Sequence, residues 1–203
     1  MREITSVDEL TALVGEPLPR VANKARPALH DLDRQWLAAS PFCLIATSAA
    51  DGTCDVSPKG DPPGFTLVLD DRTIAVPDRP GNRRVDGWHN ILSNPHVGLL
   101  YMIPGRTDTL RVNGRARLLS DAPFFDQMIV KGHRPQIVMV VDIDEIFSHC
   151  AKAFLRSELW KPETWDPEAV ASRPVIAKAT DAREMSLPEL EEYYGPAYAA
   201  RLY

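Results

Sequence analysis

Two adjacent arginines that follow a glycine and an asparagine are the residues of this sequence best suited to chemistry. The stretch 77–84 reads PDRPGNRR and joins an expected strand to an expected helix. Asn82 is a favourable N-cap residue, which would place Arg83 and Arg84 in the first helical turn. Cations oppose the helix macrodipole there, whereas a bound anion removes that conflict. The spacing therefore indicates a phosphate-binding site.

Arg79 adds a third set of hydrogen-bond donors near this proposed phosphate site. Arginine side chains bind phosphate groups through paired N–H donors, so three of them in six residues favour an anionic ligand. An alternative remains open at this stage. The arginines that end the stretch can instead point into solvent or pair with Asp78 and Asp86.

A second informative stretch, residues 55–64, reads DVSPKGDPPG. Its two glycines and three prolines restrict the path of the backbone, and we expect residues 58–64 to form neither helix nor regular strand. Such a stiff segment can hold backbone groups against the edge of a flat polar ring, with Lys59 supplying a positive charge. The alternative is a rigid corner with a solvated lysine.

Composition excludes several classes of function. The 28 acidic residues outnumber the 23 basic ones, giving a net charge of -5, which is the wrong sign for a general nucleic-acid coat. The first residues lack an apolar signal core, and no apolar run approaches the ~18–20 residues that span a bilayer. We therefore expect a cytoplasmic protein that binds neither nucleic acid nor membrane.

Cysteine usage points to reduced thiols and not to a metal site. The three cysteines, Cys43, Cys54 and Cys150, are odd in number and scattered. Cys43 and Cys54 fall in expected strands and are predicted to be buried. His149 precedes Cys150, but adjacent residues rarely share a tetrahedral centre and no second cluster exists, so no metal is expected.

The elements that must position these residues are mainly strands. The 18 prolines among 203 residues argue against a helical bundle. Alternating and continuous apolar runs predict seven strands, at residues 42–48, 53–57, 65–69, 73–76, 97–103, 109–119 and 137–143. Gly114 is expected to form a bulge. Because the connections are short, pairing should be antiparallel, and a small closed or partly open barrel is the economical arrangement.

Helices are expected inside and around this barrel. One should cover residues 83–92, after the fourth strand, with a buried stripe made of Val85, Trp88, Ile91 and Leu92. Another should run from a cap at Asp121 to about residue 130.

Both ends of the chain read as helical arms. Residues 1–40 contain a capping box of Ser6 and Glu9 before a helix that stops at Gly15. A second helix is expected at 31–39, with Leu32, Trp36 and Leu37 on one face. The chain is helical again from His149, and Ser186 and Glu189 form a later capping box. We expect three parts: an arm at 1–40, a domain at 41–160, and a tail at 161–203 that packs on the same domain or on a partner.

The order of these elements resembles the pyridoxamine 5'-phosphate oxidase-related family of FMN-binding split barrels. The similarity covers roughly residues 42–160. The GNRR element at 81–84 resembles the family's Gly-Ser-Arg-Lys element, which holds the FMN phosphate. The helix that ends ILSNP before a buried strand matches the family pattern. Residues 109–114 resemble the family strand whose early polar residue touches the flavin ring.

The resemblance implies a mainly β (α+β) fold, a six- to seven-stranded antiparallel split β-barrel with flanking helices and helical N- and C-terminal arms. It also implies a homodimer with two FMN sites at the subunit interface. Carried over by position, the phosphate would be bound by Asn82, Arg83 and Arg84. The isoalloxazine would be lined by Ser57 and Lys59, and approached from the next strands by Thr109. Pro77 and Asp78 would lie near the phosphate and ribityl chain.

The resemblance further implies that the start of the tail closes the site of the other subunit. The candidates there are Lys152, Arg156 and Trp160, although core packing is the alternative role for the tryptophan. The chain lacks the family's C-terminal segment that grips the substrate phosphate, so the small-molecule substrate is left unidentified. The basic loop 131–135 is either a solvated turn or a contact for an anionic substrate.

The resulting hypothesis is an FMN-dependent oxidase or reductase, in which the flavin carries out the hydride chemistry. No residue of the sequence stands out as an obligate acid or base. Three alternatives remain: a non-catalytic flavin-binding module that acts as a sensor or carrier, the same barrel binding haem or a deazaflavin, and a barrel with an empty site.

Overall fold

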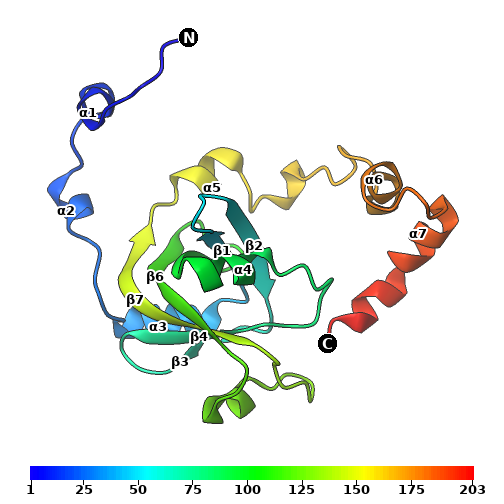
Figure 1. Ribbon diagram of the computed structural model, residues 1–203. Helices are drawn as coiled ribbons and strands as arrows, with labels where there is room; N and C mark the ends of the chain where they lie inside the picture. Colours follow the sequence, from blue (N-terminus) through cyan, green and yellow to red (C-terminus); the bar gives the residue numbers. More distant parts are fainter.

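The computed structural model describes residues 1–203, except for the side chain of Arg201. Its centre is one antiparallel sheet of seven strands in the order β2-β1-β5-β6-β7-β4-β3. The strands are β1 (Phe42–Ser48), β2 (Cys54–Gly60), β3 (Leu67–Val68), β4 (Thr73–Pro77), β5 (His96–Met102), β6 (Thr109–Leu119) and β7 (Val138–His149). Strands β2 and β3 form the two edges, so the sheet curls without closing (Figure 1). The predicted seven-stranded antiparallel split barrel is confirmed.

Short helices flank the sheet and form both arms. They are α1 (Val7–Val14), α2 (Pro19–Ala22), α3 (Asp31–Ala39), α4 (Asp86–Ser93), α5 (Lys152–Ser157), α6 (Arg173–Thr180) and α7 (Leu187–Tyr193), with 3-10 turns η1 (Pro123–Met128), η2 (Pro162–Thr164) and η3 (Pro196–Arg201). The helix expected from Asp121 to residue 130 is therefore only a 3-10 turn, which begins at Pro123 after Ala122. Among the described residues, none of the helices combines the length and the apolar composition that crossing a membrane requires.

Strand β2 is longer than the sequence predicted, and this changes what faces the interior. Pro58 pairs with Leu44 of β1, so residues 58–60 belong to a regular strand. A proline is tolerated because β2 is an edge strand, where a missing N–H faces away from the sheet. Asp55, Ser57 and Lys59 alternate with exposed neighbours and share the better-buried face. The expectation that residues 58–64 leave the sheet is wrong for the first three.

Helix α4 sits where it was expected but starts later. It begins at Asp86, after an N-cap at Val85 that offers no capping side chain. Asn82 is therefore not the N-cap, and residues 83–85 lie in the loop before the helix. Trp88 and Ile91 are buried as predicted, whereas Leu92 is 75% exposed, because it lies on the side of α4 that faces away from the sheet.

The two longest strands, β6 and β7, cross the molecule and carry one irregularity. Their register shifts between Asn113 and Gly114, which confirms the predicted bulge. A side chain at Gly114 would collide with the backbone oxygen of Asp142 in β7. β7 extends well past the expected residue 143, and His149 ends this strand; it does not begin the helical tail.

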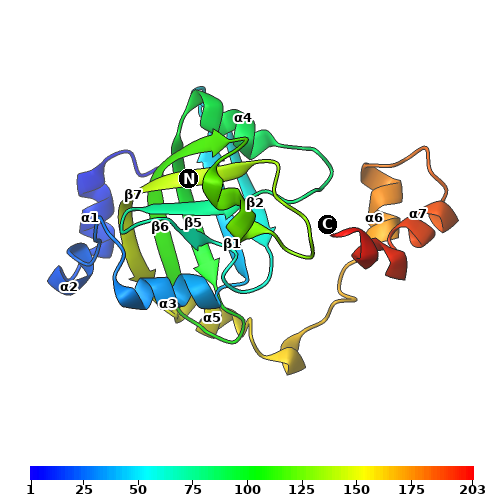
Figure 2. The ribbon, with the colours of Figure 1, turned by 90° about the horizontal axis from the view of Figure 1, so that it is seen from below.

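The arms lie outside the sheet. Ser6 caps α1 as predicted, but the Glu9 carboxylate accepts from the Thr5 amide and so does not complete a capping box. Helix α3 has the expected bounds, although Leu32 on it is exposed. Helices α1 and α2 bury no residue, and Figure 2 shows them to one side of the sheet, with α6 and α7 on the opposite side.

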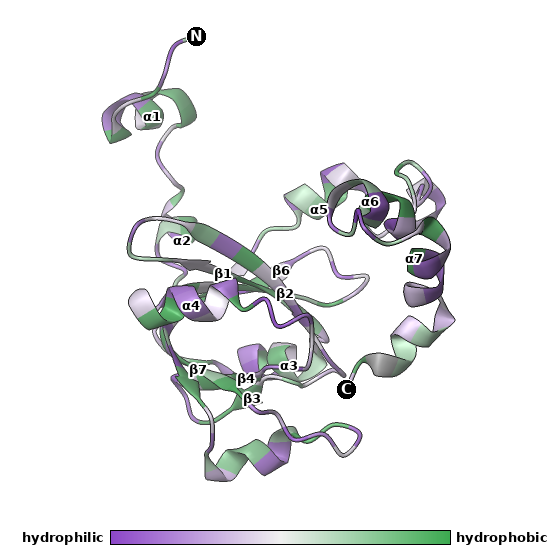
Figure 3. Ribbon diagram, turned by 45° about the vertical axis from the view of Figure 1, so that its right-hand side comes forward, coloured by the Kyte–Doolittle hydropathy of each residue, from purple (hydrophilic) through white to green (hydrophobic). Residues whose placement is uncertain are grey.

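The tail has the capping box of Ser186 and Glu189 that the sequence predicted. Its helices α6 and α7 pack on each other and mix hydrophobic with hydrophilic residues (Figure 3). Of the cysteines, Cys43 is buried, and desolvation raises the pKa of its thiol to about 12. Cys54 is exposed, contrary to expectation, because it lies on the outward face of the edge strand β2.

Candidate functional site

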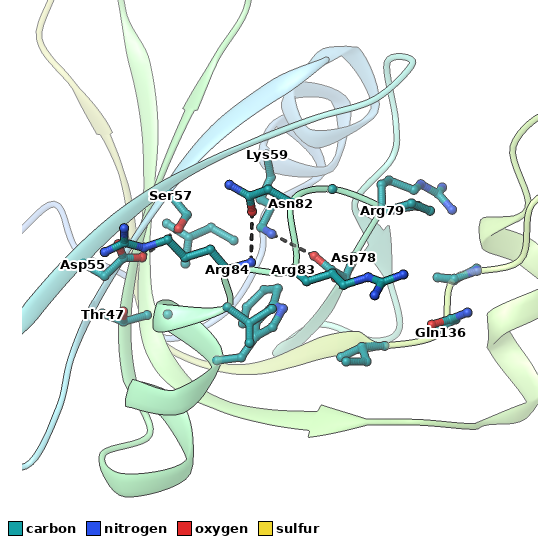
Figure 4. A pocket seen from close by; sticks show the side chains of 18 of the residues that line it. Thr47, Asp55, Ser57, Lys59, Asp78, Arg79, Asn82, Arg83, Arg84 and Gln136 are labelled. Carbon is teal, nitrogen blue, oxygen red and sulfur yellow. Dashed lines mark hydrogen bonds and ion pairs between the residues drawn. The ribbon is translucent and has the colours of Figure 1, made fainter. Parts of the chain in front are cut away.

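A cavity of about 590 Å³ lies between the sheet and the two segments that precede α4 and β7. Strands β1 and β2 supply one wall, the loop 78–85 and the start of α4 supply the second, and the loop 133–137 supplies the third (Figure 4). Seven predicted site residues line it: Ser57, Lys59, Asp78, Arg79, Asn82, Arg83 and Arg84. The structure thus brings the two informative stretches of the sequence into one site.

Cationic side chains outnumber carboxylates in the lining of the cavity, although, among the described residues, each of them except Arg83 is paired with a carboxylate. The lining contains five cationic side chains against the carboxylates of Asp55 and Asp78; the cations are Lys59, Arg79, Arg83, Arg84 and Arg134. This excess of positive charge occurs in a chain whose net charge is -5. A concave site lined mainly by one sign of charge concentrates ligands of the opposite sign. The cavity therefore suits an anion.

Lys59 belongs to the wall and is not a solvated lysine. Its ammonium lies 2.8 Å from the Asp78 carboxylate, and both side chains are about three-quarters covered. The same nitrogen sits 4.4 Å from the ring centroid of Trp88 on α4. The carboxylate and the ring hold the cation in place by charge pairing and by a cation–π contact.

Below Lys59, the floor of the cavity is a polar cluster that the sequence did not reveal. Ser57 donates to the Asp55 carboxylate at 2.7 Å, and Asn90 of α4 donates to the hydroxyl of Thr47 at 3.1 Å. A side chain at Gly87 would lie 3.1 Å from the Asp55 carboxylate, so this glycine allows α4 to approach the sheet closely. The strand predicted at residues 53–57 already puts Asp55 on the same face as Ser57, so this spacing is the signal that could have identified Asp55.

Arg79 is bonded to the protein itself. Its Nε donates to Asp61 Oδ2 at 2.5 Å, and its terminal nitrogens donate to the carbonyl oxygens of Met128 at 2.8 Å and His133 at 3.4 Å. The Asp61 side chain is only 1% exposed. Arg79, which the sequence predicted as a third phosphate donor, therefore links the segment after β4 to Asp61 and to the backbone at Met128 and His133.

The end of the loop is arranged differently. Asn82 accepts the backbone N–H of Arg84 at 2.9 Å, and Arg84 donates to the Asp86 carboxylate at 2.6 Å. That hydrogen bond raises the pKa of the Arg84 guanidinium above its usual value. For Arg84, the alternative that the sequence left open is therefore correct: this arginine pairs with Asp86. The side chain of Arg83 forms no hydrogen bond or ion pair with any residue that the structure describes.

Arg83 also has a strained backbone. Its φ of 64° lies in the left-handed region, which side chains other than glycine rarely adopt. Such strain is common at ligand sites, where the surrounding structure maintains it. Three residues later, α4 begins at Asp86 without a side-chain cap. Arg83 and the first turn of α4 both line the cavity.

The loop 133–137, whose basic part the sequence left open between a solvated turn and an anion contact, forms the third wall. His133, Arg134 and Gln136 line the cavity. Arg134 is held by two carboxylates, Asp121 and Asp126, each at 2.7 Å, and these bonds raise its pKa.

The remaining predicted residues do not line this cavity within one chain. Pro77 lines a smaller neighbouring cavity of about 240 Å³, together with Asp61 and Arg79. Thr109 is 2% exposed and pairs with His149.

The candidates of the tail lie near the start of β6 instead. Trp160 donates to the backbone oxygen of Arg106 at 2.6 Å and stacks on Phe154, 6.0 Å between ring centroids. Lys152 and Arg156 are exposed on α5. Their role in a second subunit's site stays a prediction.

Comparison with solved structures finds distant relatives of similar topology. A HupZ protein from Group A Streptococcus is 18% identical, with 59% of this chain and 93% of that chain covered and a TM-score of 0.47. An FMN-binding protein from Syntrophomonas wolfei is 12% identical, with coverage of 59% and 89% and a TM-score of 0.44. A Clostridium acetobutylicum protein related to general stress protein 26 is 12% identical, with coverage of 58% and 85% and a TM-score of 0.44.

A search of curated protein sequences finds no match. A family model for pyridoxamine 5'-phosphate oxidase, in contrast, matches residues 29–150. The matched segment is more than half of the chain and contains all seven strands, α4 and every residue that lines the cavity. The chain therefore belongs to the pyridoxamine 5'-phosphate oxidase family.

Proposed function

We propose that this protein is an FMN-dependent oxidoreductase that acts on a small molecule. The observation that carries the proposal is the cavity in which Arg83 has a strained backbone and no side-chain partner among the described residues, three positions before a helix that begins without a side-chain cap. Membership in the family supports a flavin as the ligand. A cavity of about 590 Å³ falls within the range of roughly 300–1,000 Å³ typical of small-molecule and cofactor sites.

The phosphate end of FMN suits the loop before α4. Arg83 offers a guanidinium whose donors are not used by the protein, and the first amides of α4 meet no capping side chain. A dianionic phosphate would accept hydrogen bonds from both. Asn82 keeps this loop in shape by accepting the Arg84 amide.

The opposite part of the cavity suits the flavin ring. Ser57 and Lys59 line it from β2, and Trp88 supports the lysine ammonium from below. When bound, FMN would supply hydride transfer, which no side chain of the protein can perform. Lys59 would place a cation beside the ring, and Asp78 moderates that charge at 2.8 Å.

We also propose a homodimer, in which a partner completes each site. The outward face of β1, β2 and β5 is apolar, since their registers align six such side chains: Phe42, Leu44, Val56, Pro58, Leu100 and Met102. Val56 is 59% exposed in the single chain, and burial of such a face is favourable. In this arrangement Lys152, Arg156 and Trp160 of one subunit would approach the cavity of the other.

The visible absorption spectrum of the purified protein, followed by a titration with FMN, tests the cofactor proposal. We expect flavin bands, or quenching of flavin fluorescence when FMN is added to the colourless protein. Riboflavin is the matched ligand, because it lacks only the phosphate, and it should bind at least roughly tenfold more weakly through the loss of a charged contact. A protein that binds neither flavin would overturn the proposal, and a Soret band would indicate haem in its place.

A further inference from the structure

The last residue of the described tail, Tyr203, lies in a socket on the cavity wall. The socket consists of Asp61, Arg79, Lys131 and His133, which come from three separate segments of the domain. The Tyr203 ring stacks on His133 at 5.9 Å between centroids, with 29° between the ring planes. The Arg79 guanidinium and the Lys131 ammonium lie 5.9 Å and 5.1 Å from the centroid of the tyrosine ring.

The hydroxyl of Tyr203 completes the bonding of a buried carboxylate. It donates to Asp61 Oδ1, while Oδ2 of the same carboxylate accepts from Arg79. Since the Asp61 side chain is 1% exposed, an oxygen left without a donor there would be costly. The hydrogen bond to Asp61 also raises the pKa of Tyr203, as expected for a phenol that donates to a carboxylate.

Two residues of the socket, Lys131 and His133, belong to a small hairpin at residues 130–133. Val130 and His133 exchange two backbone hydrogen bonds, at 2.9 and 3.3 Å. Lys131 and Gly132 form the turn with φ values of 50° and 81°, and the left-handed conformation is unfavourable for a lysine. The contact between Lys131 and the Tyr203 ring helps to hold this turn, and His133 at its end lines the cavity.

Tyr203 is also the point at which the tail returns to the domain. Helices α6 and α7 pack on each other, and Figure 2 shows them standing apart from the sheet while the end of the chain turns back toward it. The contacts of Tyr203 with the socket therefore connect this tail to the residues that line the cavity.

We propose that Tyr203 is a positioning residue for the cavity: its ring and hydroxyl hold in place the 130–133 hairpin, whose His133 lines the cavity, and so slow the release of the bound ligand. The first part concerns the protein alone. The second part rests on the proposed function, because it takes FMN as the ligand.

The test compares the wild-type protein with Tyr203→Ala, Tyr203→Phe and the control Tyr198→Ala. Tyr198 is a tyrosine of the same tail whose ring packs, among the described side chains, against the rings of Tyr193 and Tyr194. The first measurement is the rate of tryptic cleavage after Lys131, followed by mass spectrometry without added ligand. The second is the rate of FMN dissociation, followed by flavin fluorescence.

We expect Tyr203→Ala to be cleaved after Lys131 at least fivefold faster than the wild type and to release FMN several-fold faster. Tyr203→Phe keeps the ring and loses the donor, so it should fall between them, and Tyr198→Ala should match the wild type. Cleavage of Tyr203→Ala at the wild-type rate would overturn the proposal, as would equal acceleration in Tyr198→Ala. If no flavin binds at all, the cleavage rates still decide the role of Tyr203 in the wall.

Discussion

The two halves of the loop that joins β4 to α4 contain the same kind of side chain in opposite situations. In the first half, Arg79 is 13% exposed and donates to a buried carboxylate and two backbone carbonyls. In the second half, Arg83 has a strained backbone and no side-chain partner among the described residues. Arg79, whose donors are bonded within the protein, and Arg83, whose donors can bind a ligand, are therefore only four positions apart in the sequence.

The difference shows that a cluster of arginines does not by itself define an anion site. A guanidinium binds a ligand only with donors that the protein has not already used, and the buried Asp61 uses those of Arg79. We therefore expect a separation of effects along one loop. Changes in the first half should alter the stability of the protein, and changes in the second half should alter its affinity for a phosphate-bearing ligand.

The largest effect is expected for Arg79→Met. The substitution leaves the Asp61 carboxylate buried without its cation, and breaking a buried ion pair in this way costs about 3–5 kcal/mol of unfolding free energy. Urea denaturation, followed by circular dichroism, would measure the loss. An Arg79→Met variant as stable as the wild type would show that the first half of the loop is not structural.

The control for this experiment is the double variant Arg79→Met with Asp61→Leu. Replacing both members of a buried pair with apolar residues is often neutral, so the double variant should recover a large part of the lost stability. Because Asp61 also accepts from Tyr203, some deficit should remain. Recovery in the double variant would assign the cost to the unpaired carboxylate and not to the lost arginine stem.

The second effect is expected for Arg83→Ala, in the other half of the loop. If this guanidinium binds the FMN phosphate, its loss should weaken FMN binding by about 1.5–3 kcal/mol, roughly ten- to a hundredfold. Isothermal titration with FMN and with riboflavin would measure this. Riboflavin affinity should hardly change, because riboflavin has no phosphate for the arginine to contact. Equal weakening of both ligands would contradict phosphate recognition by Arg83.

Much of the fold was predictable because the signals that determine it are local. Helix α3 and strand β1 have the bounds that the sequence predicted. Each depends on a short pattern of apolar residues, and Pro41 lies between the two elements. The start of α4 was missed for an equally local reason. Asn82 was read as an N-cap, but its side chain accepts from the Arg84 amide in a turn, which holds residues 83–85 out of the helix.

The site was predictable only in part, because its bonding is not local. The acceptors of Arg79 lie 18, 49 and 54 residues away along the chain, so no spacing rule could assign its donors. The hairpin wall and the Tyr203 socket depend on residues that are up to 142 positions apart. Residue types thus identified where an anion would bind, whereas tertiary contacts decide which arginine is free to bind it.

The smallest effect, and the sharpest separation of stability from binding, is expected when Arg83→Gly is compared with Arg83→Ala. Both variants lack the guanidinium, so both should bind FMN equally weakly. Alanine in the left-handed region destabilises the folded protein by roughly 1–2 kcal/mol, and glycine avoids this cost. Glycine also makes the unfolded chain more flexible, which offsets about 0.5–1 kcal/mol of that advantage. The glycine variant should therefore be the more stable of the two, by about 0.5–1 kcal/mol in urea denaturation. Equal midpoints would mean that the loop relaxes without the arginine, and that ligand binding does not have to maintain its strain.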